Sequence, residues 1–144
     1  MKYLLVCTGN TCRSPMAEGI MRSLLPTGDE VRSAGTAAWP GSARARFALE
    51  AMREAGLTCD GRAQLLDQDL IDWADTVLCM ESHHREAILL HFDAPADKIR
   101  TLSDWSHGGD ADGDVPDPHG GTLDDYRRVR DQLNEMIRKK LDGH

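Results

Sequence analysis

The chain has 144 residues, 40% hydrophobic and 28% charged, which is the composition of one ordinary globular domain over residues 1–144. Its formal net charge of −7 argues against a general affinity for nucleic acid, whose phosphate backbone attracts a basic surface. No apolar segment approaches the roughly 20 residues of a membrane helix, and residues 2–7 are too short for a signal peptide. We therefore expect a cytoplasmic protein that binds neither membranes nor nucleic acid.

Short apolar segments alternate with helical patterns along the chain. Strands are expected at residues 2–7, 30–34, 75–80 and 98–102, and helices at residues 15–25, 42–55, 67–73, 82–92 and from about 122 onward. Ser14 and Pro15 are typical of a helix start, and Thr122 with Asp125 resembles a capping box. Residues 106–121, rich in Gly, Asp and Pro, are expected to form a long loop. The alternation predicts an α/β protein with a parallel sheet and helices on both faces.

The segment after the first strand has the residues of a phosphate-binding loop, Cys7-Thr8-Gly9-Asn10-Thr11-Cys12-Arg13-Ser14. Backbone N–H groups turned inward around Gly9, and the start of the following helix, suit a bound anion. Arg13 offers a planar fork for two phosphate oxygens. The same positive field favours the thiolate form of Cys7, which is then set to attack phosphorus. Ser14 could donate a hydrogen bond to that thiolate and ease its departure in a second step.

A phosphatase also needs an acid for the leaving group, and the long loop offers one. Asp117 is held between Pro116 and Pro118, which can fix one carboxylate over a cleft. The alternative is that Asp117 is one of several solvated loop acids, with Asp110, Asp112 and Asp114. Given the Cys7 loop, we favour the acid. His83 and His84 lack a second ligand cluster of recognisable spacing, so no metal is expected.

Four segments together resemble the low molecular weight protein tyrosine phosphatase family: VCTGNTCRSPMAE at residues 6–18, SAGTAAW at 33–39, WADTVLCM at 73–80 and PDPHGG at 116–121. The resemblance implies four parallel strands in the order 2-1-3-4, with the phosphate loop at the end of strand 1. It also implies a phosphocysteine intermediate on Cys7, phosphate binding by Arg13, and Asp117 as acid and then base.

The same resemblance has consequences for the surroundings of the loop. Asn10 and Ser33 would brace it, as the matching family residues do. Many members carry a His in this bracing network, near the stretch that here contains Gly61, and that His is absent. The resemblance implies no metal or organic cofactor. We expect a monomer that acts on phosphorylated proteins.

Two features bear on which phosphorylated side chain is the substrate. Thr11 is polar where many tyrosine-directed members have an apolar branched residue, and the Asp-Pro pair is followed by His119 and two glycines. This loop resembles the bacterial branch that acts on phosphoarginine. A guanidinium group prefers polar partners such as Thr11 and Asp117, whereas an aryl ring prefers an apolar wall. Trp39 could still form one aromatic wall, which keeps phosphotyrosine as the alternative.

Cys12 is next to the loop centre and could trap oxidised Cys7 as a reversible disulfide, or could simply be a small packed side chain.

Two other functional classes are alternatives to a phosphatase. An arsenate reductase would need additional cysteines to relay a disulfide, and no cysteine follows Cys79. A non-catalytic phosphate-binding module would be expected to lack Cys7, Arg13 or Asp117, and all three are present.

Overall fold

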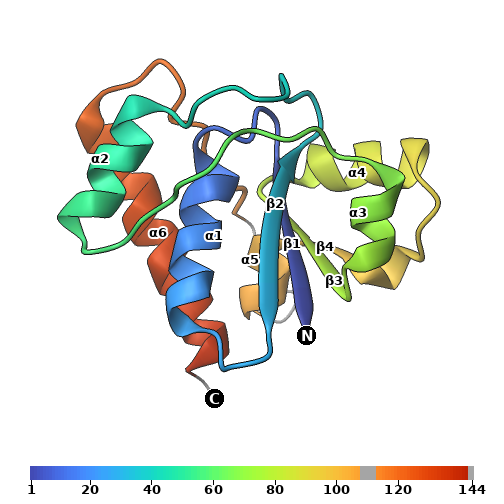
Figure 1. Cartoon of the computed structure of the whole chain (residues 1–144). Helices are drawn as coiled ribbons and strands as arrows, with labels where there is room; N and C mark the ends of the chain where they lie inside the picture. The colour runs from blue at the N-terminus through green and yellow to red at the C-terminus, as the bar shows by residue number, and fades with distance from the viewer. Residues whose placement is uncertain (108–112, 143–144) are drawn as a thin grey trace.

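Strands and helices alternate along the chain (Figure 1), in a computed structural model that describes residues 1–107 and 113–142. The elements are β1 (Lys2–Cys7), α1 (Arg13–Leu24), β2 (Glu30–Gly35), α2 (Arg46–Glu54), α3 (Gln68–Trp73), β3 (Thr76–Cys79), α4 (Ser82–His91), the 3-10 turn η1 (Ala96–Lys98), β4 (Ile99–Thr101), α5 (Leu102–His107) and α6 (Leu123–Leu141). The predicted alternation of strand and helix is confirmed.

The four strands form one parallel sheet in the order β2-β1-β3-β4, as the family resemblance implied. β1 is central, and its neighbours β2 and β3 lie on opposite sides of it. Cys7, the last residue of β1, is in register with Gly35, the last residue of β2. Strand order therefore reverses beside Cys7, the kind of position at which open α/β sheets bind ligands.

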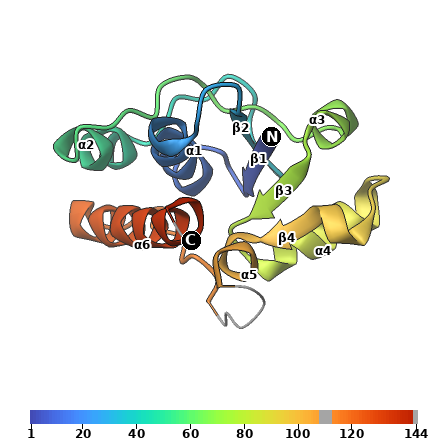
Figure 2. The same ribbon diagram turned by 90° about the horizontal axis from the view of Figure 1, so that it is seen from below.

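Two layers of helices cover the sheet (Figure 2), with α1, α2 and α6 on one face and α3 and α4 on the other. The pleat of β1 divides its side chains between them. Leu5 packs into the core that contains Ile20 of α1, and Leu4 packs into the core that contains Ile88 of α4. Both faces of β1 are buried, which explains its nearly continuous apolar sequence.

Some expected boundaries are wrong. Helix α5 occupies residues 102–107, where the sequence predicted the end of a strand and the start of a long loop. Asp110 and Asp112 of that loop lie outside the described residues. Ser14 does not cap α1, because the helix begins at Arg13 and its N-cap is Cys12, without a side-chain cap. The predicted capping box at Thr122 is confirmed, and it begins α6.

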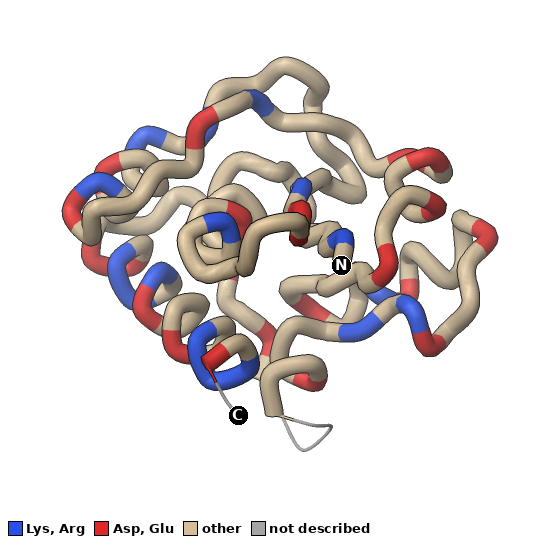
Figure 3. The backbone as a smooth tube through the Cα atoms, turned by 60° about the horizontal axis from the view of Figure 1, so that its bottom comes forward, with Lys and Arg blue, Asp and Glu red and all other residues tan. Residues whose placement is uncertain are grey.

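Acidic and basic positions are interspersed along the outer helices (Figure 3). On α6, Arg127 pairs with Asp124 and with Glu54 of α2, so the two helices are joined by ion pairs at the surface. Such exposed pairs contribute little to stability individually. Within the described residues, no helix combines the length and the apolarity that crossing a membrane would require.

Candidate active site

The ends of β1 and β2 position the loop between β1 and α1. The backbone N–H of Thr36 donates to the carbonyl of Cys7 at 2.9 Å, and that of Ala37 donates to the carbonyl of Thr8 at 3.0 Å. Gly35 is required here, because a Cβ at that position would lie 2.4 Å from the Thr8 carbonyl oxygen. Asn10 has a φ of 55°, a left-handed conformation that asparagine tolerates better than most residues. The turn that the sequence assigned to Gly9 therefore depends on Asn10.

The thiol of Cys7 is buried at the base of this loop. Its Sγ lies 2.8 Å from the hydroxyl of Ser14 and accepts a hydrogen bond from the backbone N–H of Asn10 at 3.3 Å. Ser14 is in the first turn of α1, and its hydroxyl faces Cys7 instead of the helix N-terminus. Hydrogen bonds of this kind stabilise negative charge on sulfur, so the arrangement can hold a thiolate.

A pocket of about 210 Å³ opens above Cys7 and contains most of the predicted site residues. Its lining consists of Cys7, Thr8, Gly9, Thr11, Cys12, Arg13, Asp117 and His119. Asn10, Ser14 and Ser33 are buried and do not line the pocket. Trp39 is 81% exposed and is not part of the lining, so the structure does not bring it into the pocket with the others. Its role in selectivity stays a prediction.

Asp117 lies at the open side of the pocket, with half of its side chain exposed. Its Oδ1 accepts a hydrogen bond from the backbone N–H of His119 at 3.0 Å, which restricts the carboxylate. Its Oδ2 lies 3.8 Å from Nη2 of Arg13. A carboxyl group at this place can reach the leaving atom of a substrate whose phosphate is held at the loop.

Arg13 is held by two partners that the sequence did not reveal. Its guanidinium is 2% exposed, and Nη1 donates to Oε2 of Glu81 at 2.7 Å and to the carbonyl of Val115 at 2.8 Å. Burial alone would raise the pKa of Glu81, but the hydrogen bonds from Arg13 and His83 bring that pKa below its ordinary value. Glu81 is thus a carboxylate that helps to fix the direction of the Arg13 guanidinium.

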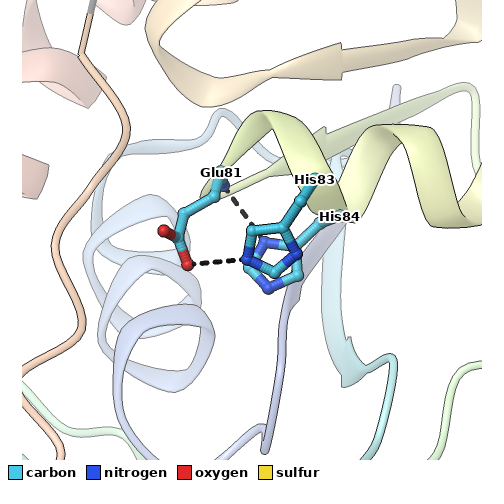
Figure 4. Close-up of side chains that lie close together, drawn as sticks. All are labelled: Glu81, His83 and His84. Carbon is cyan, nitrogen blue, oxygen red and sulfur yellow. Dashed lines mark hydrogen bonds and ion pairs between the residues drawn. The ribbon is translucent and has the colours of Figure 1, made fainter.

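Glu81, His83 and His84 gather at the start of α4, with the two rings lying one over the other (Figure 4). His84 is fully buried. Its Nδ1 accepts from the backbone N–H of Glu81 at 3.1 Å, and its Nε2 lies 2.8 Å from Oγ1 of Thr8. Burial lowers the pKa of His84 to about 4, so the ring is neutral near pH 7. These three side chains could bind a metal ion together only if His84 lost one of its hydrogen bonds, because both of its ring nitrogens are already engaged.

Asn10 is the centre of the bracing network behind the loop. Its amide Nδ2 donates to the hydroxyls of Ser14 at 2.8 Å and Ser33 at 2.9 Å. Its Oδ1 accepts from the backbone N–H of Gln64 at 2.9 Å and from Nη1 of Arg44 at 3.2 Å. Arg44 was not predicted from the sequence. The one sequence signal near it was the absence of the family's His close to Gly61, and Gly61 does lie against Arg44, since a Cβ there would be 3.3 Å from Nη2.

All four cysteines are reduced and buried. Cys12 lines the pocket beside Cys7, and its Sγ lies 3.4 Å from the hydroxyl of Tyr126. Burial raises the pKa of Cys12, and raises that of Cys79 to about 12. Cys59 and Cys79 are not in the pocket lining, so the disulfide relay of an arsenate reductase has no third cysteine there.

The fold and the site together define a class of protein: a parallel α/β sheet with a cysteine-to-arginine phosphate loop at the switch point beside β1. Comparison with known families agrees. Residues 2–142 match the model of the low molecular weight phosphotyrosine protein phosphatases. The chain therefore belongs to this family and is a cysteine-dependent protein phosphatase.

Individual relatives include both arginine- and tyrosine-directed enzymes. The chain is 41% identical to a protein-arginine-phosphatase of Geobacillus stearothermophilus, over 94% of this chain and 90% of that protein. It is 35% identical to the low molecular weight protein-tyrosine-phosphatase PtpB of Staphylococcus epidermidis, over 96% of each. Among solved structures, a C7S mutant of the YwlE arginine phosphatase with a phosphorylated active site serine superposes with a TM-score of 0.92, at 37% identity over 99% of this chain and 94% of that one.

Proposed function

We propose that this phosphatase removes the phosphoryl group from phosphoarginine in proteins, with Cys7 as nucleophile, Arg13 as phosphate ligand and Asp117 as acid and base. The observation that carries the proposal is the pocket itself. It has a buried thiol at its base, a guanidinium at its wall, a carboxyl at its mouth and Thr11 as a polar part of its lining.

In the first step, the Cys7 thiolate attacks phosphorus in line with the leaving nitrogen. An S–P bond forms, the P–N bond breaks, and Asp117 gives its proton to the departing guanidine nitrogen. Arg13 and the backbone N–H groups of the loop balance the charge on the phosphoryl oxygens. In the second step, Asp117 takes a proton from water, the water oxygen bonds to phosphorus, and the S–P bond breaks. The products are inorganic phosphate and the Cys7 thiolate, which the Ser14 hydroxyl stabilises.

Three groups in the lining support arginine as the phosphorylated side chain. The hydroxyl of Thr11 and the carboxyl of Asp117 offer polar partners to a guanidinium group, and His119 adds another polar side chain. A site built from such groups penalises an aryl ring, because its polar partners would be left unpaired. The similarity to arginine phosphatases, at 41% identity for one of them, agrees with this choice.

Phosphotyrosine is the second candidate, and one observation favours it. The segment that carries Trp39 runs directly beside the phosphate loop, as the bond from the Ala37 N–H to the Thr8 carbonyl shows. Trp39 is 81% exposed, so its neighbours leave the indole largely uncovered. A phenyl ring in the pocket could gain an aromatic partner if the indole turned towards it.

Substrate comparison separates the two candidates. We expect the wild type to hydrolyse p-nitrophenyl phosphate and Cys7→Ser to have no turnover, which tests the phosphatase chemistry. We expect kcat/KM to be higher for a phosphoarginine peptide than for a phosphotyrosine peptide of the same sequence. Thr11→Ile should reverse or reduce that ratio, since it replaces a polar contact with an apolar one. A wild-type preference for phosphotyrosine, unchanged in Thr11→Ile, would refute the arginine assignment.

The cellular compartment and the partners of the enzyme are part of the same proposal. Four buried thiols suit a reducing compartment, and we propose the cytoplasm. Phosphorylated proteins are the proposed partners, because the family that the chain matches and its arginine-directed relative are protein phosphatases. A monomeric state and the lack of nucleic-acid binding stay predictions from the sequence.

A further inference from the structure

Arg44 is a buried guanidinium behind the phosphate loop. It lies between β2 and α2, is 8% exposed, and reaches the loop backbone: Nη1 donates to the carbonyl of Asn10 at 2.7 Å. Its Nε donates to the carbonyl of Cys59 at 3.3 Å. Gly61 makes room for it, since a Cβ there would lie 3.3 Å from Nη2. Among residues 1–107 and 113–142, no carboxylate forms an ion pair with Arg44.

The donors around Asn10 determine which way its amide points. An asparagine amide can be turned over, exchanging its oxygen and nitrogen, unless its neighbours prefer one orientation. Arg44 Nη1 and the backbone N–H of Gln64 can only donate, and both face the same atom of Asn10, at 3.2 and 2.9 Å. That atom must be Oδ1. The donor Nδ2 is consequently directed at Ser14 and Ser33.

The orientation of Asn10 in turn directs two hydroxyl protons. The oxygen of Ser14 accepts from Nδ2, so its own proton is available for Cys7 Sγ, 2.8 Å away. The oxygen of Ser33 also accepts from Nδ2, and its proton goes to the carboxylate of Glu18. With the amide turned over, Oδ1 would face Ser14 and compete with Cys7 for the hydroxyl proton.

We propose that Arg44 is a positioning residue for the phosphatase reaction, which acts through Asn10 to keep the Ser14 hydroxyl donating to the Cys7 sulfur. The inference rests on the proposed role of Cys7. Arg44 does not line the pocket and touches neither phosphate nor sulfur, so it is not a catalytic residue. Its effect falls on the step in which the thiolate leaves phosphorus, because negative charge then returns to sulfur.

A double-mutant cycle tests this coupling. Arg44→Met, Ser14→Ala and the double variant are compared with wild type on p-nitrophenyl phosphate, with circular dichroism to verify folding. A hydrogen bond to a charged group corresponds to about ten- to hundredfold in rate, so we expect Arg44→Met to lower kcat by about tenfold or more. KM should change less than kcat. In the Ser14→Ala background, Arg44→Met should cost less than about twofold, because the proton that Arg44 directs is gone.

Two further variants keep the test decisive. Arg53→Met removes an exposed arginine of α2 and should leave kcat unchanged. Arg44→Lys keeps the charge and a donor, so it should restore part of the activity lost in Arg44→Met, and it replaces Arg44→Met in the cycle if the latter does not fold.

The outcomes separate the inference from the proposed function. Non-additive losses in kcat, with partial rescue by lysine, support the positioning role. Independent losses from Arg44 and Ser14, or a fully active Arg44→Met, would overturn it while the phosphatase assignment stands. A wild type that does not hydrolyse p-nitrophenyl phosphate would overturn the proposed function and this inference with it.

Discussion

Acid is expected to destabilise this protein through His84, whose buried ring joins α4 to the phosphate loop. Its Nδ1 accepts from the backbone N–H of Glu81, and its Nε2 bonds to Thr8. A proton on Nδ1 would break the first of these bonds. Burial, reinforced by the charges of His83 and Arg13, lowers the pKa of His84 from 6.5 to about 4.

The sign and size of the effect follow from proton linkage. As the pH falls, the unfolded chain binds a proton at His84 before the folded one does. The stability that comes from the neutral ring is therefore complete above the unfolded pKa of 6.5, and is lost as the pH falls towards about 4. Between about pH 7 and about pH 5 the loss is roughly 2 kcal/mol, a substantial part of the 5–15 kcal/mol of a typical domain.

Urea unfolding at the two pH values measures this loss. We expect the free energy of unfolding of the wild type to fall by roughly 2 kcal/mol more than that of His84→Gln, which has no ring to protonate. His91→Gln is the matched control, because His91 is exposed at the other end of α4 and should keep the wild-type dependence. Equal pH dependence in the wild type and in His84→Gln would refute the reasoning.

Three other substitutions test the pocket. Asp117→Asn should lower kcat/KM, which reports departure of the leaving group, by about a hundredfold or more for phosphoarginine and by less for p-nitrophenyl phosphate, whose leaving group needs little protonation; steady-state kinetics on both substrates decides, and equal losses in kcat/KM would contradict the acid role. If Cys12 traps oxidised Cys7, wild type treated with peroxide should regain its activity in dithiothreitol, whereas Cys12→Ser treated in the same way should stay inactive. Equal recovery of activity in Cys12→Ser would count against the disulfide. Trp39→Ala should change kcat/KM for phosphoarginine by less than about threefold, because Trp39 is outside the pocket. A larger loss of kcat/KM would show that Trp39 contacts the substrate.

The sheet could be predicted from sequence because its strands carry local signals. Residues 2–7 are apolar on both faces, which is typical of a central parallel strand, and the helices between strands have periodic apolar stripes. Helix α5 was missed because six residues directly after a three-residue strand are too few to show a period. Its place is decided by tertiary packing, in which Trp105 meets Tyr3 edge to face.

The loop residues could be predicted for a similar reason, since Cys7 to Ser14 are contiguous and lie between a strand and a helix. Arg44, Glu81 and His84 could not be, because their roles depend on contacts across 34 to 76 positions of the chain. Ser14 shows how a local rule can mislead. Serine before a helix is usually a cap, but here the buried Cys7 sulfur is its partner.

The central claim, that Cys7 carries the phosphoryl group during turnover, has a direct test. Enzyme turning over p-nitrophenyl phosphate is quenched in acid and digested, and the peptides are analysed by mass spectrometry, with Asp117→Asn used to slow release of the intermediate. We predict phosphate on the peptide that contains Cys7, and none in Cys7→Ala, which should be inactive. Steady turnover by Cys7→Ala, or phosphate on another residue of the active enzyme, would contradict the account.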